Sequence, residues 1–265
     1  MMTKRLIMGY LTISLWLGHC CAFCLPLQLS VGLTVSPYVV TPQNPNEKIS
    51  GFEVDIVRES LGQKGYEVQF ILQPLKRTKL SFKEKKVDGV LTVKKHYPQV
   101  KGAFFSHDYI TYHNFALTLA CNNFKINSVK DLAEKEIIAF QQAKFALGKE
   151  FQAMVTENPG YKEIASQKSQ IGMFYHKRTE VIIIDDCIFK YYKIKLKNIP
   201  THRAVTFHDI FKPSSYKIAF REKGIRNAFN EGLKELKNSG RYLHIIQSYT
   251  EHHPPAEKRN PFAGN

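Results

Sequence analysis

The stretch "ISGFEVDIVRESLGQKGYEVQFI", residues 49–71, predicts a helix that leads directly into a strand. Gly51 opens the helix, and the apolar residues Val54, Val57 and Leu61 recur at helical spacing. Apolar and polar residues then alternate in "GYEVQFIL", as they do in "LQLSVGLTV" before the helix. A strand, a helix and a strand in this order favour a parallel sheet covered by helices.

The same alternation continues along the chain and then restarts. A helix entered through Pro74 and a strand at 89–93 complete the first block. In the second block we predict a short helix at 127–135 and a strand at 136–140. Two helices at 144–155 and 168–180 and a buried strand at 181–185 follow. A long amphipathic helix from Gly224, interrupted at Gly240, ends the pattern. Two alternating blocks predict an α/β protein with two lobes, not one continuous sheet.

Residues 1–24 carry the pattern of a cleaved secretory signal peptide. Lys4 and Arg5 form a short positive segment, an apolar run follows at 6–18, and small residues come after that run. The apolar run is too short to span a bilayer comfortably. We therefore expect export to the periplasm, with an uncleaved amphipathic anchor as the alternative.

The composition is that of a folded, basic chain. Of its 265 residues 43% are hydrophobic, and 38 Lys and Arg against 23 Asp and Glu give a net charge of +15. Such a charge suits nucleic acid, an anionic membrane surface or an acidic ligand, and export argues against nucleic acid as a partner. Most of these lysines are expected simply to lie on a solvated surface. If cleavage follows Cys24, only Cys121 and Cys187 remain, and we expect two buried thiols and no disulfide. Neither has metal-ligand neighbours at short spacing, so no metal or other cofactor is expected.

Short motifs follow one another in a set order between residues 27 and 249. They are Ser36-Pro37-Tyr38, Gly51-Phe52-Glu53-Val54-Asp55, Asp88-Gly89, the F-S-x-x-Y of 105–109, the S-x-x-D-L of 128–132, the apolar strand ending in Asp at 181–185, and the segments 216–220 and 229–240. Together they resemble the periplasmic solute-binding proteins of family 3, the amino-acid-binding type associated with ABC importers. The resemblance covers nearly all of the chain after residue 24.

The resemblance implies a two-lobed α/β fold of the type II periplasmic-binding-protein kind, with mixed, mostly parallel sheets and helices on both faces. Lobe one is expected at 25–116 and again at 218–250, lobe two at 117–217, and a flexible tail at 251–265. Two crossing segments would join the lobes as a hinge, and the ligand would lie between the lobes.

The resemblance also points to an altered anion clamp. Relatives hold a ligand carboxylate with an Arg that precedes the F-S motif, where this chain has Gln99. They also use N–H groups at a helix start, where this chain has Gln142 and Lys144. Arg77, Lys94 or Lys144 is expected to replace the missing cation, although each is also compatible with a solvated surface residue.

Other positions carry over from the family individually. Asp185 matches the partner of a ligand amino group, and its alternative role is to cap the following helix. Tyr38 matches an aromatic that stacks on the ligand, Thr92 lies at a strand end where relatives bind the ligand, and Leu75 replaces an aromatic. The predicted ligand-binding residues are Tyr38, Leu75, Arg77, Thr92, Lys94, Gln99, Gln142, Lys144 and Asp185. Glu53 and Asp55 are instead interpreted as structural caps in the first turn of their helix.

The predicted function is that of a monomeric, exported substrate-binding protein and not an enzyme. It would capture a small polar solute, an amino acid or a related organic acid, for the membrane permease of an ABC importer. The alternative is an enzyme on the same scaffold that resembles the cyclohexadienyl dehydratases, which act on prephenate or arogenate. The sequence has no Ser-His-Asp order and no persuasive acid/base pair. A basic protein that binds anionic polymers of the envelope is a third hypothesis.

Overall fold

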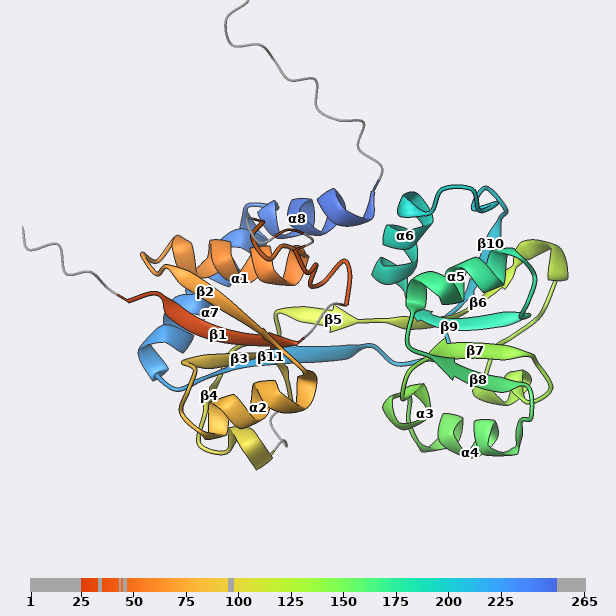
Figure 1. The fold of residues 1–265 in the computed structure, drawn as a ribbon, viewed down its shortest axis with the longest axis horizontal. Coiled ribbons are helices and arrows are strands. Elements are labelled where there is room, and N and C mark those ends of the chain that lie inside the picture. Colours follow the sequence, from red (N-terminus) through yellow and green to blue (C-terminus); the bar gives the residue numbers. More distant parts are fainter. Residues whose placement is uncertain (1–24, 33–34, 43, 45–46, 95–97, 252–265) are drawn as a thin grey trace, which may run out of the picture.

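The computed structural model describes residues 25–32, 35–42, 44, 47–94 and 98–251, without the side chains of Leu75, Lys76 and Gln99. The described chain folds into two lobes, each built on its own sheet with helices on both faces (Figure 1). This confirms the predicted two-lobed α/β architecture. The predicted signal peptide and nearly all of the predicted tail lie outside the described residues. No helix in these ranges is long and apolar enough to cross a membrane.

The first lobe has a six-stranded sheet in the order β2-β1-β3-β11-β4, with β5 also paired to β11. Its strands are β1 (Leu27–Gly32), β2 (Val68–Gln73), β3 (Gly89–Val93), β4 (Phe104–Phe105), β5 (Ile110–Tyr112) and β11 (Ser214–Phe220). Strands β1, β2 and β3 are parallel, and β11 runs antiparallel to β3. The helices are α1 (Phe52–Gly62), α2 (Leu75–Lys83), η1 (Pro98–Val100), α7 (Lys223–Asn238) and α8 (Arg241–Thr250). Figure 1 shows α2 on one face and α1, α7 and α8 on the other.

The second lobe has a five-stranded sheet in the order β10-β6-β9-β7-β8. Its strands are β6 (Asn114–Leu119), β7 (Ile137–Phe140), β8 (Tyr161–Ile164), β9 (Val181–Asp185) and β10 (Val205–His208). The helices are η2 (Ala120–Asn122), η3 (Val129–Leu132), α3 (Ala143–Ala146), α4 (Lys149–Glu157), α5 (Gln167–Tyr175) and α6 (Asp186–Lys195). Helices α5 and α6 cover one face, and α3 and α4 the other (Figure 1). Every residue of the central strand β9 is buried, as its continuous apolar run predicts.

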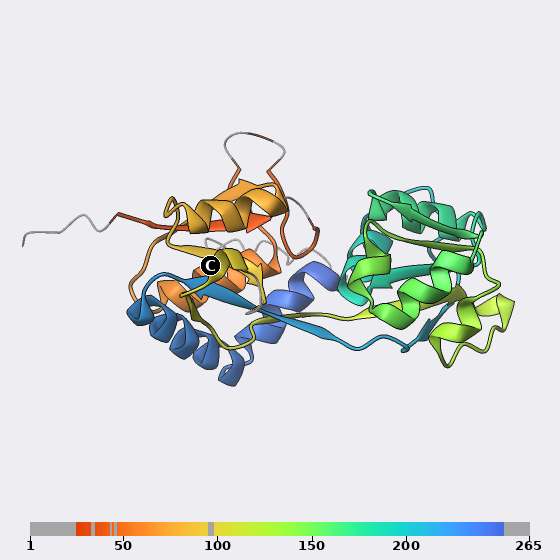
Figure 2. The same ribbon diagram turned by 90° about the horizontal axis from the view of Figure 1, so that it is seen from below.

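Two extended segments connect the lobes, as Figure 2 shows from below. The chain leaves the first sheet after β5 and enters the second at β6, with only His113 between them. It returns through residues 209–213 between β10 and β11. His113 Nε2 lies 2.8 Å from Asp209 Oδ1, so the two crossings contact each other. The expected lobe boundaries at 116/117 and 217/218 fall inside β6 and β11.

Two predictions about local structure need correction. The helix expected at 144–155 is two helices, because Gly148 between α3 and α4 has φ 100°, a conformation that ends a helix and that glycine adopts without strain. Cys121 is exposed, so the expected burial of both thiols is wrong for this residue, while Cys187 is partly buried. The predicted interruption at Gly240, where φ is 76°, is confirmed.

Close packing of α1 on α7 depends on Gly232. A Cβ atom at this position would lie 1.9 Å from the Ser60 carbonyl oxygen in α1. Because backbone atoms cannot give way as a side chain can, we expect Gly232→Ala to lower the free energy of unfolding by about 1–3 kcal/mol. Gly224→Ala in the same helix meets open space and is the matched control. Denaturant unfolding tests this, and equal effects of the two substitutions would contradict the packing described.

Candidate functional site

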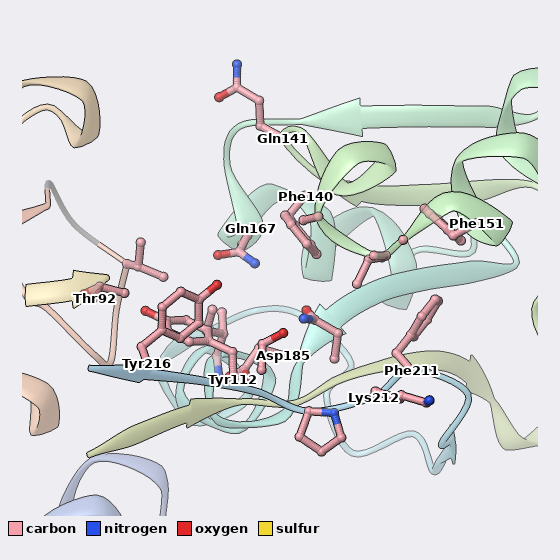
Figure 3. Close-up of a pocket in the computed structure, with 18 of the residues that line it drawn as sticks. Thr92, Tyr112, Phe140, Gln141, Phe151, Gln167, Asp185, Phe211, Lys212 and Tyr216 are labelled. Carbon is pink, nitrogen blue, oxygen red and sulfur yellow. Dashed lines mark hydrogen bonds between the residues drawn. The ribbon is translucent and has the colours of Figure 1, made fainter. Parts of the chain in front are cut away.

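A cavity of about 900 Å³ lies between the lobes and is lined by residues from both. Residues of the first lobe in the wall include Val35, Val39, Glu53, Pro74 and Thr92. The crossing strands contribute Tyr112, Asn114, Ser214 and Tyr216. Residues of the second lobe include Phe140, Gln141, Gln167, Asp185 and Ile188. In Figure 3, Tyr112, Tyr216 and Asp185 lie together, with Thr92 on one side and Gln167 and Phe140 on the other. A concave wall that combines apolar side chains with polar groups from both lobes is typical of a small-molecule site.

Asp185 is the polar centre of the wall on the side of the second lobe. It ends β9 and caps α6, where its Oδ1 accepts a 3.1 Å hydrogen bond from the Ile188 N–H. Its Oδ2 accepts from the His113 N–H at 2.9 Å and from the Tyr38 hydroxyl at 3.0 Å. Burial, and then the charge of Asp186, raise the pKa of Asp185 to about 7, although the three hydrogen bonds act in the opposite direction. The carboxyl group is therefore both a helix cap and a cavity group that titrates near neutral pH.

Tyr38 supports the cavity wall from behind. Its ring is fully buried and stacks on Tyr112, with 3.9 Å between ring centroids and 12° between planes. Tyr112, and not Tyr38, is the ring that lines the cavity. Because Tyr38 belongs to the first lobe and Asp185 to the second, their hydrogen bond joins the lobes.

The buried Glu53 and the partly buried Thr92 form a hydrogen-bonded pair on the opposite wall. Thr92 Oγ1 donates to Glu53 Oε1 at 2.6 Å, and the Tyr109 hydroxyl donates to the same oxygen. The Thr92 N–H in turn donates to the Tyr109 oxygen at 3.1 Å. Burial raises the pKa of Glu53, against the lowering effect of these two hydroxyl donors.

This geometry corrects the interpretation of Glu53 as a helix cap. Its carboxyl group leaves the first turn of α1 and points to residues 92 and 109, whereas Asp55 pairs with Arg58 and accepts from the Tyr249 hydroxyl at 2.6 Å. Thr92 has φ 55°, which is rare for a β-branched residue and strained by about 1–3 kcal/mol. The hydrogen bonds from Thr92 to Glu53 and Tyr109 hold this strained strand end in place.

The start of α3, expected to attract a ligand anion, holds a carboxylate of the chain itself. The Gln142 N–H donates to Glu163 Oε2 at 2.6 Å, and the Lys144 N–H donates to Oε1 at 3.0 Å. The Tyr161 hydroxyl adds a 2.7 Å bond to Oε1. Partial burial opposes ionisation, but these donors and the Lys144 charge hold the pKa of Glu163 below its ordinary value. Glu163 was not singled out from the sequence, because only the β7–β8 register, which pairs it with Ala139, brings it there.

The three cations predicted to replace the missing arginine are not among the residues of the described cavity wall. Arg77, on α2, forms a 3.3 Å ion pair with Glu84 at the end of that helix. The Lys94 ammonium lies 5.1 Å above the centroid of the Tyr216 ring, which lines the cavity. Lys144 lies over the exposed Phe145.

Thr92 and Asp185 are thus the predicted residues that line the cavity, and Tyr38 and Lys94 contact tyrosines that line it. The side chains of Leu75 and Gln99 lie outside the described part of the structure. Tyr112 and Tyr216 stand edge-on to each other with centroids 5.5 Å apart, and neither was predicted from the sequence. The only signal for them was an aromatic residue on each crossing strand.

Comparisons with known proteins agree with this architecture. Residues 27–252 match the family described as bacterial extracellular solute-binding proteins, family 3. A comparison with curated proteins gives no match. Among solved structures, the GluR0 ligand-binding core in complex with L-glutamate has 15% identity, covers 86% of this chain and 100% of its own, and has a TM-score of 0.65.

Two ancestral proteins are similar in fold. An ancestral cationic amino acid solute-binding protein has 19% identity, covers 85% of this chain and 96% of its own, and has a TM-score of 0.66. An ancestral amino-acid-binding protein described as a precursor of cyclohexadienyl dehydratase has 20% identity, the same coverages of 85% and 96%, and a TM-score of 0.60. At such low identities, the structural similarity shows a shared fold alone. The family match extends over nearly the whole described chain. The chain belongs to the bacterial extracellular solute-binding proteins of family 3.

Proposed function

We propose that the protein is exported and captures a small polar solute between its two lobes for delivery to an ABC importer. The observation that carries the proposal is the cavity of about 900 Å³, which has a buried carboxyl group on each of the facing lobes: Asp185 on one side and Glu53, bonded to the partly buried Thr92, on the other. The signal-peptide pattern of residues 1–24 and the extracellular character of the family support export. Neighbouring structures named for amino acid ligands support a small polar solute.

Capture would use the two crossings as a hinge. A solute that contacts both walls favours the closed arrangement of the lobes, because it can contact both walls only in that arrangement. The His113–Asp209 contact ties the crossings together, and the Tyr38–Asp185 hydrogen bond ties the lobes beside the cavity. The crossings that would act as the hinge thus lie next to the site, and rotation about them would open or close its walls.

Thermal unfolding with a solute panel tests the proposal. The protein is freed of bound solute by unfolding, dialysis and refolding, and is then melted with amino acids, organic acids, amines and short peptides. A solute that binds only the folded state adds about 2.7 kcal/mol of stability at 100 times its Kd, so one chemical class is expected to raise Tm clearly. If every compound leaves Tm unchanged, the binding function is wrong.

A periplasmic enzyme is the second candidate, and the titration of Asp185 near neutral pH favours it. A carboxyl group with a pKa of about 7 in a cavity wall can act as a general acid. One neighbouring structure is described as a precursor of cyclohexadienyl dehydratase, although it is itself an amino-acid-binding protein. Turnover of prephenate or arogenate by the pure protein, lost in Asp185→Asn, would establish this candidate in place of simple binding.

A further inference from the structure

Two buried carboxyl groups line the cavity, one from each lobe. Glu53 and Asp185 each have a relative exposure of 1%, and both belong to the cavity wall. Among the residues that the structure describes, no lysine, arginine or histidine forms a salt bridge with either carboxyl group. A buried carboxylate without a counter-ion is strongly unfavourable. A solute that brings positive charge would therefore be held by both walls.

Aromatic rings between these groups add to the preference for a cation. The charges of Glu53 and Asp185, after burial, both raise the pKa of the Tyr112 phenol, which places both carboxyl groups near this one ring. Tyr216, edge-on to Tyr112, already has the Lys94 ammonium 5.1 Å from its ring centroid. Ring faces attract ammonium groups, so this wall is suited to a cationic solute.

The described wall of the cavity has no buried basic side chain for a carboxylate. The two N–H groups at the start of α3 hold Glu163, and Arg77 is paired with Glu84 away from the cavity. The wall includes Lys149 and Lys212, but both are exposed, where solvent and salt screen their charges. Buried groups act in a lower dielectric, so the two acids outweigh these lysines in selecting a solute.

We infer that the solute is an aliphatic diamine or polyamine without a carboxylate, with one ammonium group held by Glu53 and another by Asp185. The inference rests on the proposed function and names the solute class for the same cavity. The apolar part of the wall, which includes Val35, Val39, Leu147 and Ile188, suits the methylene chain between the two charges.

Isothermal titration with matched compounds tests the inference on the refolded, solute-free protein. The probes are 1,5-diaminopentane and spermidine, compared with lysine, which is 1,5-diaminopentane with one added carboxylate, and with glutarate, a dicarboxylate of similar length. We expect 1,5-diaminopentane to bind at least tenfold more tightly than lysine, and glutarate not to bind. A carboxylate on the solute would meet the two buried acids instead of a basic partner.

Two variants connect the binding to Glu53. Glu53→Gln removes the charge and keeps an oxygen for the Thr92 and Tyr109 hydroxyls, and we expect it to weaken diamine binding at least tenfold. Glu157→Gln removes an exposed charge on α4 outside the cavity wall, and it is expected to leave binding unchanged. Circular dichroism of both variants without solute checks that the fold is retained.

Each outcome decides between separate claims. If neither 1,5-diaminopentane nor spermidine binds while an amino acid or organic acid does, the solute class is wrong and the binding function stands. If no compound of this set or of the wider panel binds, the proposed function fails and the inference fails with it. If Glu53→Gln and Glu157→Gln bind the diamine equally well, Glu53 is not part of the site.

Discussion

Asp185→Asn is expected to weaken solute binding by about 30- to 5000-fold, the equivalent of 2–5 kcal/mol for loss of one member of a buried, hydrogen-bonded charge pair. The carboxyl group is buried and faces the cavity, and no basic side chain in the described part of the chain forms a salt bridge with it. A solute ammonium group would therefore be its charge partner. The substitution removes that charge but keeps the shape of the side chain and an oxygen that can cap α6 at the Ile188 N–H.

Asp186→Asn is the matched control for this experiment. Asp186 is the next residue, but its carboxylate forms a 2.8 Å ion pair with Lys190 and is not part of the cavity wall. The Asp186 charge also raises the pKa of Asp185, so the proteins are compared at about pH 9, where Asp185 is ionised with or without that charge. Loss of a partly exposed pair changes stability by less than about 1 kcal/mol, and binding is then expected to stay within threefold of the original protein. Titration calorimetry compares the two variants. An Asp185→Asn protein that retains its affinity within threefold would remove this residue from the site.

The free energy of unfolding of the solute-free protein is expected to fall as the pH rises from 4 to 8. The pKa of Asp185 is about 7 in the folded protein and 3.8 as an unperturbed group. Between these values the folded state carries a proton that the unfolded state has lost, so stability declines with rising pH. At 1.36 kcal/mol per pKa unit, Asp185 contributes at most roughly 4 kcal/mol to this decline. Glu53, whose pKa is also raised, acts in the same direction.

Other groups act in the opposite direction, so the test is a difference between two proteins. Burial lowers the pKa of His208, and hydrogen bonds lower that of Glu163, so both reduce stability as the pH falls. Asp185→Asn leaves these groups unchanged. Denaturant unfolding at pH 4, 5, 6, 7 and 8 is therefore expected to show the variant gaining stability relative to the original protein as the pH rises. Parallel pH profiles of the two proteins would contradict the raised pKa of Asp185.

Much of the fold could be predicted because its signals are local. The sequence predicts β3 at 89–93 and β9 at 181–185, and the structure has the same bounds. Both could be predicted because each is a short apolar run that ends in a polar or charged segment. The restart of the alternating pattern predicted the two lobes. The break at Gly148 was missed, because a glycine within a helical pattern does not reveal the sign of its φ angle.

The site was harder to predict because tertiary contacts decide which groups remain for a ligand. Thr92 and Asp185 could be found because both lie at strand ends that border the gap between the lobes. Arg77 has its partner Glu84 at the end of its own helix, and the helix start at Gln142 receives Glu163 from a neighbouring strand. Helix-dipole reasoning favoured a cap for Glu53, but hydroxyl groups far along the chain direct it inward. The partners of such groups are not visible in spacing or composition.

A crystal structure of the protein grown with saturating 1,5-diaminopentane shows whether one solute molecule is held by both lobes. We expect density for the solute beside Tyr112 and Tyr216, with one nitrogen within hydrogen-bond distance of Asp185 and the other of Glu53. Solute density outside the gap between the lobes, or contacts with one lobe alone, would contradict it.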